Sequence, residues 1–280
     1  MSMIEFLQQF DFDWLILSMK AITILGNEEF YLLVLPVLIW CWRKTSVLPL
    51  VILLLLNFWI NYEFKEFFHL ARPEGVNLIS AEHYGFPSGH AQGAMVLWGY
   101  LAWLLNRVNG KQVYGWFGLI IVFIGLSRIY LGVHFPSDVI GGWSIGFVIL
   151  FIGIRVVKIV EARKLKFPTI PTVVLVGFVG LMLALLRPSD ISVRAGGMLA
   201  GLVGGMLVEL EYLKSSLAAR WWQNALKIII GVAGILILKI GIKMILPELL
   251  WADWLRYGII GLWMGFGAPL VFAGLRLRKN

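Results

Sequence analysis

The chain alternates between long runs of apolar residues and short polar segments. A helix needs roughly 20 consecutive apolar residues to cross a bilayer. Runs of this kind predict transmembrane helices over 27–42, 47–69, 88–106, 113–132, 137–158, 169–187, 193–212, 223–246 and 254–274. The polar segments between them are too short for a soluble domain. The pattern therefore predicts an all-α fold, a polytopic membrane helix bundle of about nine transmembrane helices.

The N-terminal stretch, residues 3–25, has a different pattern. It carries Glu5, Asp11 and Asp13, and its apolar run starts only at Trp14. This mixture favours an amphipathic helix in the membrane interface over a spanning helix. If the stretch does span, the number of spans rises to about ten. We expect three regions: an N-terminal interfacial helix (1–26), a catalytic membrane core (27–160) and additional C-terminal transmembrane helices (161–280).

Composition and charge agree with a membrane protein. Hydrophobic residues make up 60% of the chain and charged residues 14%, whereas soluble domains have about 25% charged residues. The net charge of +8 would suggest nucleic acid as the partner of a soluble chain. Here the basic residues gather in alternate loops between spans, so we expect no nucleic-acid partner. The single cysteine, Cys41, excludes an internal disulfide and a cysteine-based metal cluster.

The distribution of basic residues predicts the topology, because cytoplasmic loops are rich in Lys and Arg. Basic residues cluster at 43–44, 107–111, 155–166, 214–220 and 276–279. These segments and the C-terminus are therefore predicted to be cytoplasmic. The segments around 65–90 and 127–138 then face outward. The short loops favour a bacterial cytoplasmic membrane.

Three groups of polar residues lie at the predicted outward ends of the spans. They comprise Lys65 with Arg72-Pro73, then Pro87-Ser88-Gly89-His90, and finally Ser127-Arg128 with His134 and Asp138. Each group has a structural explanation when taken alone, such as snorkelling cations or a helix start. Together they supply three cations, a hydroxyl and a helix N-terminus that favours an anion. The combination predicts a phosphate-binding site.

Two histidines divide the chemistry at such a site. His134 and Asp138 are four residues apart around a helix start, so the carboxylate can orient one imidazole nitrogen and leave the other free to attack phosphorus. His90 is suited to protonate the leaving oxygen and then to activate the water that cleaves the phosphohistidine. The cations stabilise the transition state. We expect no metal and no cofactor.

The same residues resemble the type 2 phosphatidic acid phosphatase superfamily, which also contains lipid phosphate phosphatases, glucose-6-phosphatase catalytic subunits and vanadium haloperoxidases. The resemblance covers about residues 27–158, and every position of the three-part motif matches. It implies a core of that type. It also implies these roles: His134 as nucleophile, His90 as acid/base, Asp138 as orienting partner, and Lys65, Arg72, Ser88, Gly89 and Arg128 as phosphate ligands. Vanadate, which mimics the trigonal transition state of the expected mechanism, should inhibit.

The substrate stays open at this point. A phosphorylated lipid can reach a site at the membrane surface laterally, and its phosphate monoester or diphosphate is our leading expectation. A sugar phosphate or another small phosphate ester is an alternative, as is transfer of the phosphate to an acceptor alcohol. A transporter or a non-catalytic lipid-binding protein would also fit the number of spans, but neither needs a pair of histidines. Nothing indicates an obligate protein partner.

Two asparagines share a helix face with a motif residue. Asn57, Asn61 and Lys65 follow one another at four-residue spacing. Polar residues in a span point into the bundle or into a cavity. Asn57 and Asn61 therefore either line the cleft that leads to the phosphate site or form hydrogen bonds between helices.

Overall fold

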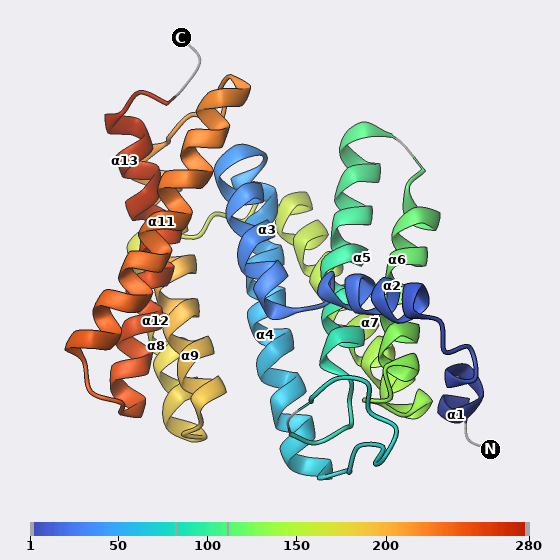
Figure 1. The fold of residues 1–280 in the computed structure, drawn as a ribbon. Helices are drawn as coiled ribbons and strands as arrows, with labels where there is room; N and C mark the ends of the chain where they lie inside the picture. The colour runs from blue at the N-terminus through green and yellow to red at the C-terminus, as the bar shows by residue number, and fades with distance from the viewer. Residues whose placement is uncertain (1–2, 82, 111, 278–280) are drawn as a thin grey trace. The chain divides into compact units, whose positions relative to one another are not determined.

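The chain folds as a set of α-helices in a computed structural model that describes residues 3–81, 83–110 and 112–277 (Figure 1). The N-terminal helices are α1 (Met3–Gln8), α2 (Asp13–Ile24), α3 (Glu28–Cys41), α4 (Lys44–Phe68), α5 (Gly89–Asn109), α6 (Tyr114–Tyr130) and α7 (Pro136–Ala162). The C-terminal helices are α8 (Thr169–Leu186), α9 (Asp190–Met198), α10 (Gly204–Val208), α11 (Trp221–Ile245), α12 (Leu250–Leu262) and α13 (Ala268–Gly274). Three π-helical segments interrupt this second set: η1 (Leu199–Val203), η2 (Glu209–Leu213) and η3 (Trp263–Gly267).

Each apolar run of the sequence coincides with a helix or with a continuous series of helical segments. Within the described residues, six of these stretches are long and apolar enough to cross a membrane, or up to seven if the bent pair α2 and α3 counts as one span. The protein is therefore an integral multi-pass membrane protein. The predicted number of nine is not confirmed: α5 lies outside this set, and α6 has only 17 residues.

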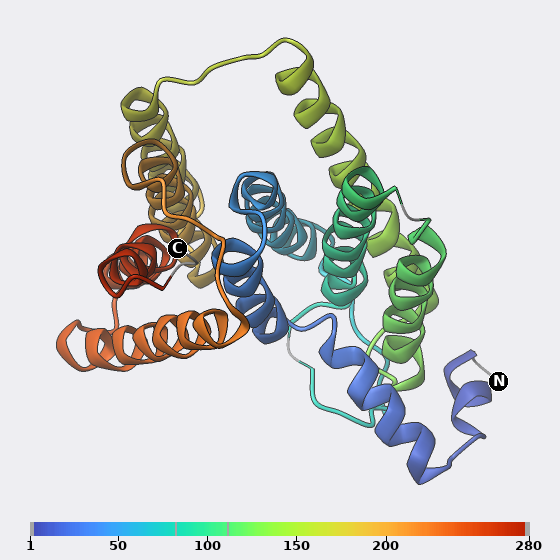
Figure 2. The same cartoon turned by 90° about the horizontal axis from the view of Figure 1, so that it is seen from above.

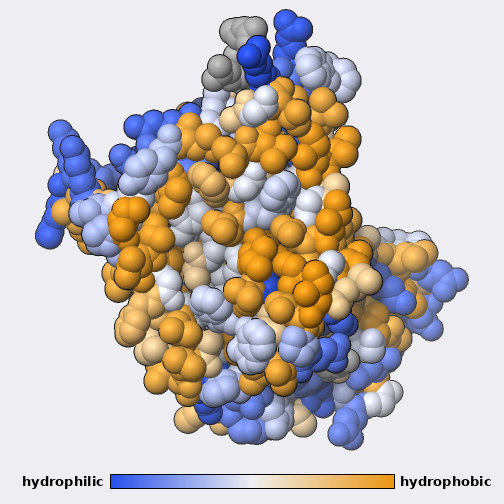
Figure 3. Space-filling model, turned by 90° about the vertical axis from the view of Figure 1, so that its left-hand side faces the viewer, coloured by the Kyte–Doolittle hydropathy of each residue, from blue (hydrophilic) through white to orange (hydrophobic). Residues whose placement is uncertain are grey.

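The exposed surface of the long helices is apolar. Phe147 of α7, Phe178 of α8 and Ile237 of α11 are 56%, 56% and 69% exposed. On the face shown in Figure 3, hydrophobic side chains cover much of the central surface, and the strongly hydrophilic ones lie mainly along its edges. Apolar side chains that would be unfavourable against water are favourable against lipid.

The described chain divides into two compact units. The first contains residues 3–31 and 56–160, and the second contains residues 32–55 and 161–277. One boundary between the units falls near residue 160. The other boundaries fall within α3 and α4, so residues 32–55 group with the C-terminal helices.

In the first unit, α5 and α6 run side by side, and α2 lies crosswise over α6 (Figures 1 and 2). The start of α7 packs closely against α5. A Cβ atom added at Gly142 would come within 2.6 Å of the Ser88 carbonyl oxygen, and one at Gly146 within 2.6 Å of the Gln92 carbonyl oxygen. Glycines at four-residue spacing allow the two helix backbones to approach this closely.

The N-terminal region differs from the single helix expected over 1–26. It consists of two helices, α1 and α2, separated by residues 9–12, and a further bend of 51° separates α2 from α3. Acidic residues lie in the first turn of each new helix, Asp13 in α2 and Glu28 in α3, where a carboxylate favours the positive helix end. Ile4 of α1 is buried against Ala91 and Ile129, so this region is part of the first unit.

The second unit pairs two helical stretches through small residues. α9 and η1 pack against α12. A Cβ atom added at Gly197 would come within 2.2 Å of the Trp254 carbonyl oxygen, and one at Gly201 within 1.9 Å of the Gly258 carbonyl oxygen. As in the first unit, glycines at four-residue spacing allow the backbones to touch.

Candidate active site

The residues of the three-part motif all lie in the first unit and at the ends of its helices. Lys65 is in the last turn of α4, and Arg72 lies in the loop that follows it. Ser88 caps the start of α5, which begins with Gly89 and His90. Arg128 is in the last turn of α6, His134 lies in the next loop, and Asp138 is in the first turn of α7. The main-chain N–H of Ser88 donates to the Asp138 carbonyl at 2.9 Å, which joins the second and third groups.

His134 and Asp138 form the pair that the spacing predicts. The His134 Nδ1 atom lies 3.4 Å from Asp138 Oδ2, and the two side chains are 2% and 3% exposed. The same carboxylate oxygen accepts a hydrogen bond of 2.9 Å from the Phe135 main-chain N–H. The helix start at Pro136 thus holds the carboxylate in place, and the carboxylate orients the imidazole.

Arg72 lies on the other side of the His134 ring. Its Nη1 atom is 3.0 Å from His134 Nε2 and donates to the Val133 carbonyl at 2.8 Å, while its Nε donates to the His83 carbonyl at 2.9 Å. A guanidinium has only donors, so Nε2 must be the accepting nitrogen of a neutral ring, and Nδ1 carries the proton toward Asp138. The free lone pair of the ring is therefore on Nε2, next to a cation.

The surroundings of His134 lower the pKa of its imidazole well below 6.5. Burial is the main cause, followed by the positive charges of Arg72, Arg128 and Lys65. A base with a lowered pKa stays neutral to lower pH. The free protein therefore keeps His134 in its neutral form under mildly acidic conditions.

We expect the pH profile to report this shift. The acidic limb of kcat/KM due to His134 should lie well below pH 6.5, since kcat/KM reflects the free enzyme. The measurement covers roughly pH 4 to 8 and is corrected for the second ionisation of the substrate phosphate, near pKa ~6. In Arg72→Met the limb should move to higher pH, because one of the charges that lower the pKa is gone. A wild-type limb at or above 6.5 would contradict the assignment.

Ser88 and Gly89 form the start of α5. Ser88 is fully buried, and its hydroxyl has no hydrogen-bond partner within the described part of the chain. A buried hydroxyl without a partner is unfavourable, which indicates that a ligand supplies one. A Cβ atom at position 89 would come within 3.1 Å of Asn61 Oδ1, so glycine also gives the room that the backbone needs there.

The two other cations are held by neighbours that the sequence did not point out. Lys65 Nζ donates to the Tyr84 carbonyl. Arg128 is 5% exposed, and its Nη1 donates to Thr23 Oγ1 at 2.8 Å, while its Nε has no partner in the ranges that the structure describes. Arg128 thus has a donor left for an anion.

His90 also has a partner from the N-terminal region. Its Nε2 lies 2.7 Å from Asn27 Oδ1, an acceptor, so this nitrogen carries a proton. Gly26 permits the contact, because a Cβ there would come within 3.3 Å of the His90 ring. Sequence reasoning missed Thr23 and Asn27. The available signal was a polar Asn-Glu-Glu segment that interrupts two apolar runs.

Asn57 and Asn61 are buried, with exposures of 0% and 7%. Asn61 Nδ2 donates to Gln92 Oε1 at 2.8 Å and to the Pro87 carbonyl at 3.2 Å, and Gln92 Nε2 donates to the Asn57 carbonyl at 3.2 Å. This geometry favours the second of the two sequence interpretations for Asn61, a hydrogen bond between α4 and α5. The hydrogen bond from Asn61 to the Pro87 carbonyl also holds in place the peptide group that precedes Ser88.

We expect Asn61→Leu to act on stability more than on substrate binding. The substitution leaves buried groups of Gln92 and Pro87 without their partner, a loss of about 1–3 kcal/mol. The thermal unfolding temperature should fall while KM stays within about twofold of wild type. A raised KM with unchanged unfolding temperature would instead identify Asn61 as a cleft residue.

Comparison with known proteins identifies the family of this chain. Residues 46–161 match the model of the PAP2 superfamily, and residues 193–280 match that of the transmembrane extension of PAP2 superfamily phosphatases. Phosphatidylglycerophosphatase B of Bacillus subtilis is 33% identical over 149 residues, which are 50% of this chain and 73% of that protein. The chain belongs to the PAP2 superfamily. It is accordingly a phosphoric ester hydrolase.

A solved structure shares the fold of this PAP2 core. The first transmembrane PAP2-type phosphatidylglycerolphosphate phosphatase from Bacillus subtilis superimposes with a TM-score of 0.51 and 28% identity, over 59% of this chain and 85% of that one.

Rat sphingosine-1-phosphate phosphatase 1 is 29% identical over 165 residues, which are 55% of this chain and 37% of that relative. The match to the rat relative therefore spans just over a third of its length.

Proposed function

We propose that the protein releases phosphate from a phosphate monoester or diphosphate of a lipid, through a phosphohistidine on His134. The observation that carries the proposal is the orientation of the His134 ring: Nδ1 faces Asp138 at 3.4 Å, and Nε2 faces Arg72 at 3.0 Å. A phosphate bound to Arg72 would lie next to the lone pair of Nε2.

In the proposed first step, His134 Nε2 attacks phosphorus, the N–P bond forms and the bond from phosphorus to the ester oxygen breaks. His90, protonated on both ring nitrogens, gives its Nδ1 proton to the leaving oxygen, while Nε2 keeps the proton that it shares with Asn27. The ring of His134 gains a positive charge, which Asp138 stabilises. Lys65, Arg72 and Arg128, with Ser88 and the N-terminus of α5, balance the charge on the three equatorial oxygens.

In the second step, His90 takes a proton from water while the water oxygen attacks phosphorus. The N–P bond then breaks and inorganic phosphate leaves, so both histidines return to their starting forms. The same intermediate would give phosphotransfer if an acceptor alcohol replaced water. Each step uses side chains of the first unit alone.

A lipid substrate is supported by two observations. The curated relatives include a phosphatidylglycerophosphatase, sphingosine-1-phosphate phosphatases and an undecaprenyl-diphosphatase from Sulfolobus acidocaldarius. In addition, the site residues lie at the ends of helices whose outer surfaces are apolar, where a lipid can approach from the bilayer. The loop charges support a location on the outer face of a bacterial cytoplasmic membrane, with the C-terminus inside.

A phosphate-release screen of the purified full chain tests the proposal. Phosphatidate, phosphatidylglycerol phosphate, sphingoid phosphate, undecaprenyl diphosphate and glucose 6-phosphate are compared side by side in detergent. We expect kcat/KM to be at least about tenfold higher for one of the lipids than for glucose 6-phosphate. Preference for glucose 6-phosphate would overturn the lipid assignment, and absence of release from all five would overturn the enzyme activity.

Chelation of metals tests the mechanism separately. Because histidine is the proposed nucleophile and cationic side chains hold the phosphate, EDTA should leave the rate of phosphate release unchanged within about twofold. Vanadate, which takes the trigonal geometry of the transition state, should inhibit. Loss of activity in EDTA that returns on addition of magnesium would contradict the mechanism.

A further inference from the structure

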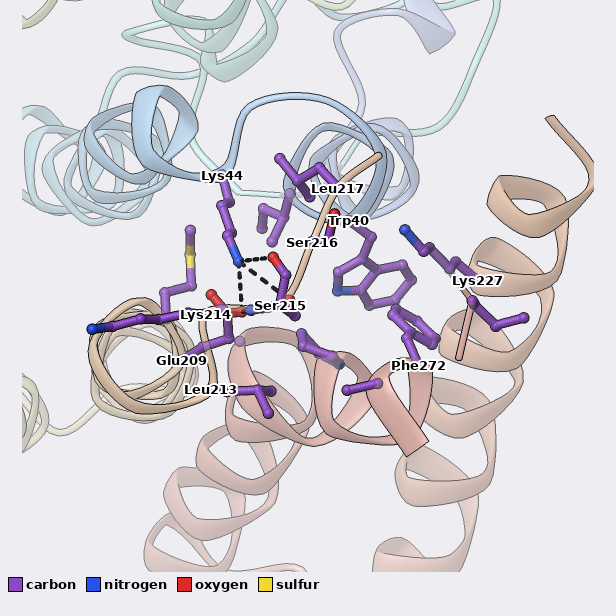
Figure 4. A pocket seen from close by; sticks show the side chains of 16 residues that line it. Trp40, Lys44, Glu209, Leu213, Lys214, Ser215, Ser216, Leu217, Lys227 and Phe272 are labelled. Atoms are coloured by element: carbon purple, nitrogen blue, oxygen red, sulfur yellow. Dashed lines mark hydrogen bonds and ion pairs between the residues drawn. The ribbon is translucent and has the colours of Figure 1, made fainter. Parts of the chain in front are cut away.

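A cavity in the second unit carries polar and charged residues that the proposed reaction does not use. Its volume is about 70 Å³, several times the ~10–15 Å³ that one water needs. It lies among the ends of α3 and α4, the η2 segment, α11 and α13 (Figure 4). Its walls include Trp40, Lys44, Glu209, Ser215, Lys227 and Phe272.

On one side of the cavity, Lys44 and Glu209 form an ion pair. Lys44 Nζ lies 2.6 Å from Glu209 Oε1 and donates to the Ser215 carbonyl at 2.6 Å. The same carboxylate oxygen accepts from the Ser215 main-chain N–H at 2.8 Å. Figure 4 shows these three side chains together and the ammonium group of Lys214 turned away from them. The charge of Glu209 is thus balanced by Lys44.

The other side of the cavity holds a cation, Lys227, that has no carboxylate among the described residues to balance its charge. Lys227 of α11 is 2% exposed, and its side chain extends toward the indole of Trp40 (Figure 4). Among residues 3–81, 83–110 and 112–277, no side chain or carbonyl makes a hydrogen bond or ion pair with its ammonium group. A charge buried in this way is strongly unfavourable unless an opposite charge joins it.

The remaining walls are apolar, and part of the backbone around them is π-helical. Trp40, Leu217, Phe272 and Leu277 line the cavity together with residues of the π-helical segments η2 and η3. π-helical turns occur frequently at functional sites. Loop charge predicts that residues 43–44 and 214–220 face the cytoplasm, where basic pockets between helices bind the phosphates of anionic lipids.

From the buried Lys227, the adjoining cavity and its apolar walls, we infer that this cavity is a second anion site, which binds a phosphate group with Lys227 as its counter-ion. The phosphate can belong to a lipid headgroup or be free in solution. Glu209, already paired with Lys44, orients that lysine and does not oppose the ligand. The site is independent of the proposed reaction, since its lining residues all belong to the second unit.

The single cysteine gives a local reporter for this site. Cys41 follows Trp40, is partly buried, and its thiol lies 3.9 Å from the carbonyl oxygen of Asn224, three residues before Lys227. The rate at which N-ethylmaleimide alkylates Cys41 is measured on the full chain in maltoside detergent. Inorganic phosphate and dioctanoyl phosphatidylglycerol are added in separate arms, with ionic strength matched by chloride.

We expect one of the two compounds to slow alkylation about tenfold at a concentration about ten times its Kd, because protection scales as 1 + [L]/Kd. Protection should be lost in Lys227→Met and kept in Lys239→Met, which changes an exposed lysine of the same helix. Protection by phosphate identifies a site open to the free ion, and protection by the lipid alone identifies a headgroup site. Absence of protection by both, or equal protection in Lys227→Met, would overturn the inference.

A second comparison applies if Lys227→Met folds poorly. In the wild type, dioctanoyl phosphatidylglycerol is compared with neutral dioctanoylglycerol. Only the phosphate-bearing lipid should protect Cys41, whereas equal protection by the neutral lipid would show an apolar groove without an anion site.

Discussion

Replacement of His134 by alanine is expected to lower phosphate release by at least ~10³-fold, to the rate seen without enzyme. The substitution removes the atom that forms the bond to phosphorus. Arg72 and Asp138 remain, so substrate binding should change little, and the loss should appear in kcat. The measurement is phosphate release from the best lipid of the screen, with binding followed separately by vanadate or product inhibition.

The intermediate provides an independent readout. Rapid quench of wild type with a labelled substrate phosphate should trap label that is stable in base and released in acid, as expected for phosphohistidine, and His134→Ala should trap none. His69→Asn is the matched control, because His69 is exposed and its left-handed backbone, with φ of 50°, suits asparagine. It should keep wild-type activity. Retention of a tenth or more of activity in His134→Ala would exclude His134 as the nucleophile.

His90→Ala is expected to have an effect that depends on the leaving group. For an alkyl phosphate the rate should fall by ~10²–10⁴-fold, because the alkoxide then leaves without a proton. For p-nitrophenyl phosphate, whose leaving group needs no proton, formation of the phosphoenzyme should be nearly unchanged. Its hydrolysis should become slow, since no base activates the water. The variant should therefore release one equivalent of p-nitrophenol per enzyme in a burst.

Asn27 offers a milder version of the same test. Its Oδ1 holds His90 Nε2 at 2.7 Å, so Asn27→Ala should loosen the acid/base without removing it. We expect the same dependence on the leaving group, with a smaller loss on the alkyl ester. Equal losses on both substrates, with no burst in His90→Ala, would mean that His90 acts on the structure and not on the proton transfer.

Two parts of the site show what local sequence can and cannot reveal. His134 and Asp138 are four residues apart on either side of a helix start at Pro136, so spacing alone predicts the contact. The partners of Arg128 and His90, in contrast, lie more than 60 residues away in the chain. No periodicity connects Thr23 or Asn27 to them, because the contacts depend on how α2 packs across α6.

The sequence also did not predict which helices pack together. Hydropathy is a property of each residue in turn, so it located the ends of the helices closely, from α3 to the α12–α13 stretch. It carries no record of which helix packs against which. The close contact of α7 with α5 at Gly142 and Gly146 and the assignment of residues 32–55 to the C-terminal unit both come from the structure.

By itself, the sequence determined the helical membrane class and the three-part motif, because apolar runs and short-range spacing act within one segment of chain. Only the tertiary structure decided the tautomer of His134, the partners of His90 and Arg128, the role of Asn61 between α4 and α5, and the cavity around Lys227. Each of these depends on side chains from segments that are distant in the chain, and their distances and burial arise only when the helices pack.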